Sequence, residues 1–110
     1  MSAAELTAAC LLRIEERNGG PPSPDGRSDA INAWVTLYPD AAREQAREAD
    51  RRLAREGERA PLLCGIPLAL KDLYGVAGLP LTASSRVLDG NVATRDARVW
   101  AVLRLSLIHI

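Results

Sequence analysis

The stretch GIPLALKDLYGV, residues 65–76, decides how this sequence is interpreted. It belongs to a nearly unbroken apolar run, residues 60–70, in which glycine and proline exclude a helix. We therefore expect a short loop into a buried strand, with Pro67 at its start or edge and with Lys71 and Asp72 at its end. A lysine at the end of a strand is usually an ordinary surface residue. It becomes a base only where burial lowers its pKa, because desolvation disfavours the ammonium form.

The sequence before this strand begins with a predicted helix over residues 2–17. Ser2 and Glu5 have the spacing of a capping box, and apolar residues recur at helical spacing behind them. Residues 19–29 contain three prolines and three glycines, which predicts a surface loop. Residues 30–37 form a short apolar segment that fits either a strand or an extended entry to the next helix.

A second helix is predicted to begin at Pro39 and to end at Gly57. Proline is tolerated in the first turn of a helix, and glycine commonly ends one. Arg and Glu alternate along one side, with Glu48 placed four residues before Arg52, which is typical of a solvated face. The opposite side is lined by Ala42, Ala46, Ala49 and Leu53.

A third helix is predicted over residues 96–103, where Val99, Val102 and Leu103 follow helical spacing with Trp100 beside them. The order of helix, helix, buried strand, loop and helix predicts an α/β fold. With 110 residues, the chain has room for at most one modest domain.

Composition narrows the classes of function. The 14 basic and 14 acidic residues cancel, which gives no support to a nucleic-acid-binding surface. The two cysteines lie far apart without a CxxC motif, so we interpret them as reduced and expect no metal site. No segment resembles a signal peptide, and no apolar run approaches the roughly 18 residues of a membrane span, so the cytoplasm is the expected location.

The common motifs of enzyme chemistry are missing from the sequence. There is no phosphate-binding glycine loop, no GxSxG nucleophile elbow and no HExxH, and no cofactor is expected. The single histidine, His109, has no evident partner. Ser84 and Ser85 lie near Lys71 in sequence, but no glycine-rich turn accompanies them to expose a nucleophile or to supply oxyanion donors. Lys71 remains as the one candidate catalytic residue.

The surroundings of Lys71 resemble the N-terminal part of the amidase signature family. That family shows a Gly-[Ile/Val]-Pro-x-x-x-Lys-Asp strand end, then a Val-x-Gly-x-x-Thr stretch, a cluster of small residues and an Asp-Ala-x-Val helix. The matching residues are Gly65-Ile66-Pro67, Lys71-Asp72, Val76, Gly78, Thr82, Ser84-Ser85, Asp96-Ala97 and Val99. Departures from the pattern at Leu73, Leu81 and Ser84 leave the subfamily and the substrate open.

The resemblance implies a partial amidase-signature fold, with N-terminal helices and the first strands of a mixed sheet, over residues 5–104. It also implies a Ser–cis-Ser–Lys triad in which Lys71 is the general base and small-molecule amides are the substrates. Both triad serines belong to a later Gly/Ser-rich block, so the 110 residues alone are expected to be inactive. Residues 105–110 do not follow the family, and we expect them to be a foreign tail.

Two alternatives remain open at this point. The first is the glutaminase subunit of an aspartyl/glutamyl-tRNA amidotransferase, which resembles the amidases in its triad but passes ammonia to a partner. The second is a helical interaction module without chemistry, which would bind a partner through the face of Ala42, Ala46 and Leu53. The sequence does not define an oligomeric state.

Overall fold

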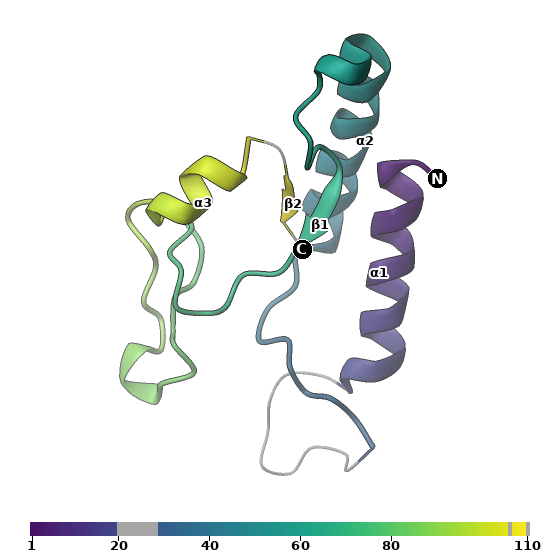
Figure 1. Cartoon of the computed structure of the whole chain (residues 1–110). Helices are drawn as coiled ribbons and strands as arrows, with labels where there is room; N and C mark the ends of the chain where they lie inside the picture. The colour runs from purple at the N-terminus through teal and green to yellow at the C-terminus, as the bar shows by residue number, and fades with distance from the viewer. Residues whose placement is uncertain (20–28, 106, 110) are drawn as a thin grey trace. The chain divides into compact units, whose positions relative to one another are not determined.

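The structure is a computed structural model and describes residues 1–19, 29–105 and 107–109. Most of the predicted proline- and glycine-rich loop, residues 20–28, lies outside the described residues. The chain forms two compact units: unit 1 comprises Met1–Leu68 with Ser106–Ile110, and unit 2 comprises Ala69–Leu105. Unit 1 contains the two long helices and a pair of strands (Figure 1). Unit 2 contains Lys71.

Helix α1 (Ala3–Asn18) confirms the first predicted helix and its start signal. The Ser2 hydroxyl accepts from the backbone N–H of Glu5, and the Glu5 carboxylate accepts from the backbone N–H of Ser2, which together form the capping box. Gly19 ends the helix in the left-handed conformation at φ 71°. The side chain of Asn18 then accepts from the N–H groups of Ala33 and Trp34, which ties residues 30–37 to α1 as an extended segment and not as a strand.

Helix α2 (Pro39–Glu56) confirms the second predicted helix, with proline in its first turn and Gly57 at its end. A single 3₁₀ turn, η1 (Gly57–Arg59), follows it. The Arg and Glu side chains of α2 form ion pairs along its exposed side. Glu48 contacts Arg51 at 2.8 Å, and Arg52 contacts another carboxylate one turn further on. Several alternative partners lie within one turn, and such exposed pairs differ little in free energy.

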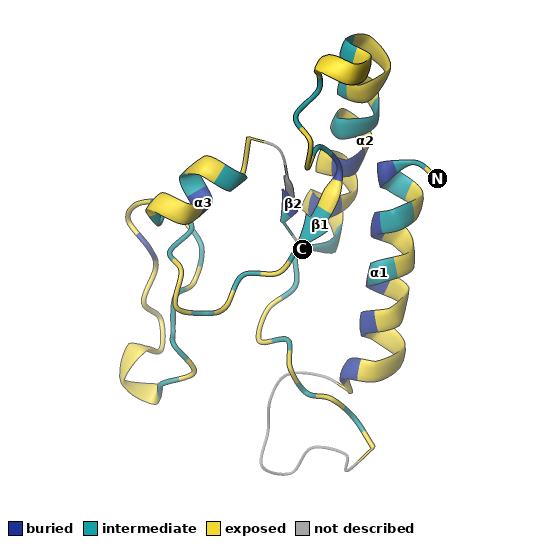
Figure 2. Cartoon of the chain, viewed as in Figure 1, coloured by how far each residue is buried: buried dark blue, intermediate teal, exposed yellow. Residues whose placement is uncertain are grey.

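The core of unit 1 lies where α1 and α2 pack side by side (Figure 2). Its buried apolar residues are Ala3, Leu11, Ile14, Ala42, Ala46 and Ile108. Ala42 and Ala46 have no exposed surface at all. The helix face that the interaction-module alternative requires is therefore mostly occupied by the chain's own core, although Leu53 retains 37% exposure.

The predicted buried strand is present but short and only partly covered. Strand β1 (Ile66–Leu68) pairs in parallel with β2 (Leu107–His109), with Ile66 opposite Leu107 and Leu68 opposite His109. Parallel strands need a long crossover connection, and unit 2 supplies it here. The strand is shorter and less buried than expected: Ile66 is 44% exposed, and β1 ends at Leu68, three residues before Lys71.

Unit 2 consists mainly of turns, with a 3₁₀ helix η2 (Arg86–Leu88) and the short helix α3 (Arg98–Leu103). The predicted helix at residues 96–103 therefore begins two residues late, because Asp96 instead accepts from the backbone N–H of Ala77 at 2.8 Å. The helical spacing of the valines does not mark the buried side of α3. Trp100 is buried, whereas Val99 and Val102 are exposed. Burial of the much larger indole surface outweighs that of two valines.

Candidate active site around Lys71

Lys71 lies three residues beyond the end of β1, in a tight turn of unit 2. Its backbone carbonyl accepts from the N–H groups of Leu73 at 2.6 Å and Tyr74 at 3.0 Å. The second of these bonds closes a β-turn, so the carbonyl side of Lys71 is fixed by local hydrogen bonds. The side chain is exposed. Lys71 is also the only lysine in the sequence.

Asp72, the next residue, anchors a loop ten residues further along the chain. One carboxylate oxygen accepts from the backbone N–H of Thr82 at 3.0 Å. The other accepts from the Thr82 hydroxyl at 2.6 Å and from the backbone N–H of Ser84 at 3.3 Å. Burial of the carboxyl group favours its neutral form, but the hydrogen bonds from Thr82 and Ser84 outweigh burial, and the pKa of Asp72 is lowered.

The loop that Asp72 anchors has an unusual backbone. Ala83 and Ser84 are both non-glycine residues with positive φ, at 50° and 54°. Such residues are strained and persist where surrounding contacts hold them. Ser85 follows, and its hydroxyl accepts from the N–H of Val87 at the start of η2. The Ser85 hydroxyl thus caps η2.

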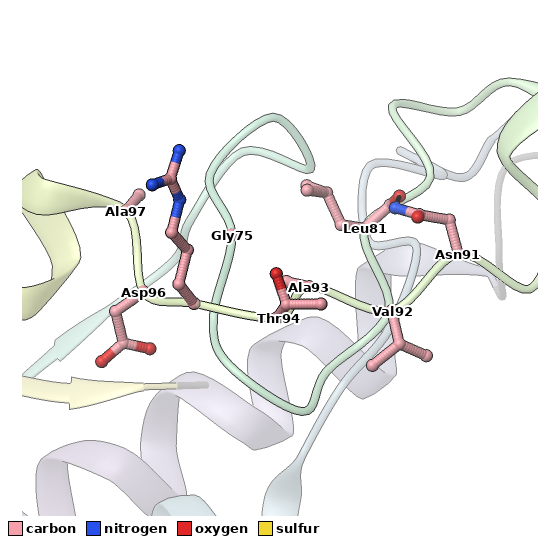
Figure 3. Close-up of a pocket in the computed structure, with 9 residues that line it drawn as sticks. Gly75, Leu81, Asn91, Val92, Ala93, Thr94, Asp96 and Ala97 are labelled. Atoms are coloured by element: carbon pink, nitrogen blue, oxygen red, sulfur yellow. Dashed lines mark hydrogen bonds between the residues drawn. The ribbon is translucent and has the colours of Figure 1, made fainter.

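An open pocket of about 320 Å³ lies elsewhere in unit 2 and is drawn in Figure 3. It is lined by Gly75, Leu81 and residues 91–97, and Lys71 does not line it. A Cβ at Gly75 would make a tight contact there, 3.0 Å from the carbonyl oxygen of Arg95. The lining combines small residues with the charged residues Arg95 and Asp96. Asn91 donates to the carbonyl of Leu81 at 2.7 Å, so its amide helps to hold the wall together.

His109, the only histidine, lies in unit 1. Its ring centroid is 5.7 Å from that of Tyr38, and its backbone N–H donates to the side chain of Gln45 at 3.0 Å. Burial lowers the pKa of His109. Cys10 and Cys64 are half-buried free thiols. Among the described residues, no three His, Cys, Asp or Glu side chains are grouped to hold a metal ion, and no helix is long and apolar enough to cross a membrane.

The described residues therefore combine helices with a small parallel sheet, the layout of an α/β protein, with a lysine close after the first strand. The sequence model of the family called Amidase matches residues 25–108. The A-type subunit of glutamyl-tRNA(Gln) amidotransferase from Jannaschia sp. (strain CCS1) is 38% identical over 104 residues, which cover 94% of this chain and 18% of that protein. The protein of the same name from Bartonella tribocorum (strain CIP 105476 / IBS 506) is 44% identical over 103 residues, with the same two coverages.

Solved structures are also similar to this chain. The peptide amidase PAM, in complex with the competitive inhibitor chymostatin, matches with a TM-score of 0.75 and 31% identity over all of this chain and 21% of that one. An inhibitor-bound vestigial protein complex, described as revealing the origins of an s-triazine catabolic enzyme, matches with a TM-score of 0.79 and 28% identity. That match covers 99% of this chain and 22% of the other.

This chain belongs to the amidase family, and its fold is part of the α/β amidase fold. It spans only 18% of the length of the curated relatives named above. The matched segment includes Lys71, Asp72, Thr82 and Ser84. Sequence reasoning identified these four as parts of one pattern but missed the hydrogen bonds that join the last three. The only available signal was an acidic residue and a Thr/Ser cluster ten residues apart, which many unrelated loops also contain.

Proposed function

We propose that this chain is the N-terminal part of an amidase-type hydrolase in which Lys71 is the general base. The observation that carries the proposal is the family match over residues 25–108, which contains the Lys71-Asp72 block. The neutral amine of Lys71 takes a proton from a bridging serine, which takes one from the nucleophilic serine. The nucleophilic oxygen then attacks the amide carbonyl, ammonia or an amine leaves, and water hydrolyses the acyl-enzyme. The substrate is a small-molecule amide, and neither triad serine is assigned to these 110 residues.

The 110-residue chain alone is predicted to be inactive. Acyl transfer needs a nucleophile, and the serines near Lys71 have other roles: the Ser85 hydroxyl caps η2, and Ser84 sits in the loop held by Asp72. The Lys71 side chain is also exposed, whereas a lysine acts as a base when it is removed from water. On this proposal residues 5–104 are the amidase portion and the location is the cytoplasm. Residues 105–110 stay a proposed foreign tail, although the family match extends to residue 108 and Ile108 is buried in the core of unit 1.

Amide hydrolysis tests the proposal in two proteins. The purified 110-residue chain should release no ammonia from simple amides, and detectable hydrolysis that Lys71→Ala abolishes would contradict the predicted inactivity. The enzyme translated from the genomic reading frame through codon 104 and beyond should be active. In that enzyme Lys71→Arg is the sharpest variant, because arginine keeps the positive charge and length but does not deprotonate near neutral pH. A Lys71→Arg enzyme with the wild-type rate would exclude Lys71 as the base.

A second candidate is favoured by the names of the two curated relatives, which are both glutamyl-tRNA(Gln) amidotransferase subunits. In that case the longer protein would hydrolyse glutamine and pass the ammonia to a partner subunit. The measurement that separates the two is ammonia release from glutamine and from other primary amides, with and without proteins encoded beside the gene. Activity confined to glutamine and raised by a neighbouring subunit indicates the amidotransferase. Broad activity of the isolated enzyme indicates an amidase.

A non-catalytic interaction module is the weakest of the three functions. Its proposed docking face includes Ala42 and Ala46, and both are fully buried in unit 1. A partner would have to displace the parts of unit 1 that cover them, which exposes the apolar core.

A further inference from the structure

We propose that Asp72 is a positioning residue that holds the backbone of Lys71 in register with the loop at residues 82–84. The inference rests on the proposed role of Lys71 as the base. It assigns no proton transfer to Asp72. Its role is to fix the point from which the lysine side chain extends, through hydrogen bonds that lie entirely within unit 2.

The first step of the argument is the convergence of donors on one carboxylate. The Asp72 carboxylate accepts hydrogen bonds from the backbone N–H groups of Thr82 and Ser84 and from the hydroxyl of Thr82, at distances from 2.6 to 3.3 Å. Backbone N–H groups of a turn that point to one side form a site for an anion. Here the anion is a side chain of the same unit. Hydrogen bonds to a charged acceptor are stronger than neutral ones, so this contact is a firm link between the two segments.

The second step is the backbone strain on the other side of that link. Ala83 and Ser84 both have positive φ, a backbone conformation that is strained for any residue other than glycine. Glycine would adopt this conformation without strain, but neither position is a glycine. The strained turn directs the N–H groups of Thr82 and Ser84 at Asp72. A strained loop that is held by the residue next to a proposed base is the arrangement expected for support of a reactive group.

The third step concerns Lys71 itself. Its carbonyl is fixed by the N–H groups of Leu73 and Tyr74, and the following residue is fixed through its side chain by the 82–84 loop. The peptide unit between Lys71 and Asp72 is therefore held at both ends. A lysine side chain has four rotatable bonds, so an imprecise backbone would spread the amine over several ångströms. A displacement of about 1 Å can lower a catalytic rate by about 100-fold.

The structural link is tested in the 110-residue chain by amide hydrogen exchange. Asp72→Ala should accelerate exchange at Thr82 and Ser84 by 10-fold or more, because both N–H groups lose their acceptor. Asp89→Asn is the matched control, since it removes an exposed carboxylate of the same unit. Its exchange rates at Thr82 and Ser84 should equal those of the wild type. Unchanged exchange in Asp72→Ala would overturn the proposal, as would equal acceleration in the Asp89→Asn control.

The positioning role is tested in the longer active enzyme by steady-state kinetics, with kcat expressed per titrated active site. Asp72→Asn should lower kcat by about 10- to 100-fold and change KM by less than about twofold. Thr82→Val should lower kcat in the same way, and Thr82→Ser, which keeps the hydroxyl, should restore it. A merely structural role predicts fewer active sites with an unchanged kcat for each, and that result would overturn the proposal. If Lys71→Arg retains full activity, the proposed function fails instead, which separates the two conclusions.

Discussion

Asp50 joins the two long helices of unit 1, and its replacement should loosen the start of α1. Its two carboxylate oxygens accept from the backbone N–H groups of Ala3 at 2.7 Å and Ala4 at 3.0 Å. These N–H groups belong to the first turn, where a helix offers them no internal partner. The local cap does not replace Asp50, because the Ser2 hydroxyl already serves the N–H of Glu5.

The magnitude follows from these contacts. Loss of a capping side chain costs about 0.5–2 kcal/mol, and loss of a negative charge at a helix N-terminus costs about 0.3–1 kcal/mol. Asp50 is half-buried and provides both effects. We therefore expect Asp50→Ala to destabilise α1 by about 1–2 kcal/mol, which is a factor of about 5–30 in the opening equilibrium. Amide hydrogen exchange at Leu11 and Ile14, in the middle of the helix, measures this factor directly.

Two variants make the Asp50 result interpretable. Asp50→Asn keeps one oxygen acceptor without the charge, so its effect should fall between those of the wild type and Asp50→Ala. Asp40→Ala removes an exposed carboxylate that pairs only at the surface with Arg43, and exchange in α1 should change by no more than about twofold. The reasoning is refuted if Asp50→Ala leaves exchange in α1 unchanged, or if Asp40→Ala accelerates it equally.

Two further predictions concern the stability of unit 1. Gly65 is buried at φ 83°, and a Cβ there would lie 2.8 Å from that of Ala3. Gly65→Ala should therefore cost about 2–4 kcal/mol in urea unfolding, and more than Gly57→Ala, where the added methyl meets open space; equal losses would contradict the predicted clash. Burial lowers the pKa of His109 below 6.5, so the unfolded chain binds the proton first as the pH falls. The contribution of His109 to stability should be complete above about pH 6.5 and decline below it, and His109→Phe should remove that dependence in a pH series of thermal melts.

The helices were the most predictable part of the fold because their signals are local. The capping box of α1 and the proline start of α2 need only a few neighbouring residues to be recognised. The extent of β1 was not predictable in the same way. Its length depends on β2, which lies about 40 residues further along the chain, and pairing at that distance leaves no local pattern.

The candidate site was predictable in its residues but not in its contacts. Lys71 and Asp72 were identified from a pattern, and the structure supplies the hydrogen bonds from Asp72 to Thr82 and Ser84. Periodicity located α3 but did not indicate its buried side, because a six-residue helix has less than two turns and one large side chain decides which face is buried. A hydrophobic period is informative only where several turns share the same buried face.

The exposure of the Lys71 side chain shows that the described residues do not shield its amine from water. Backbone order around Lys71 is complete within unit 2, since its carbonyl and the next side chain are both hydrogen-bonded. The amine is not removed from water, because the side chain is exposed. These are separate requirements of a lysine base: the first fixes where the amine lies, and the second lets it lose its proton near neutral pH. The proposed function therefore requires further protein to cover Lys71. Because Lys71 is the only lysine of the sequence, the solvent accessibility of its side-chain amine can be measured without interference from other lysines.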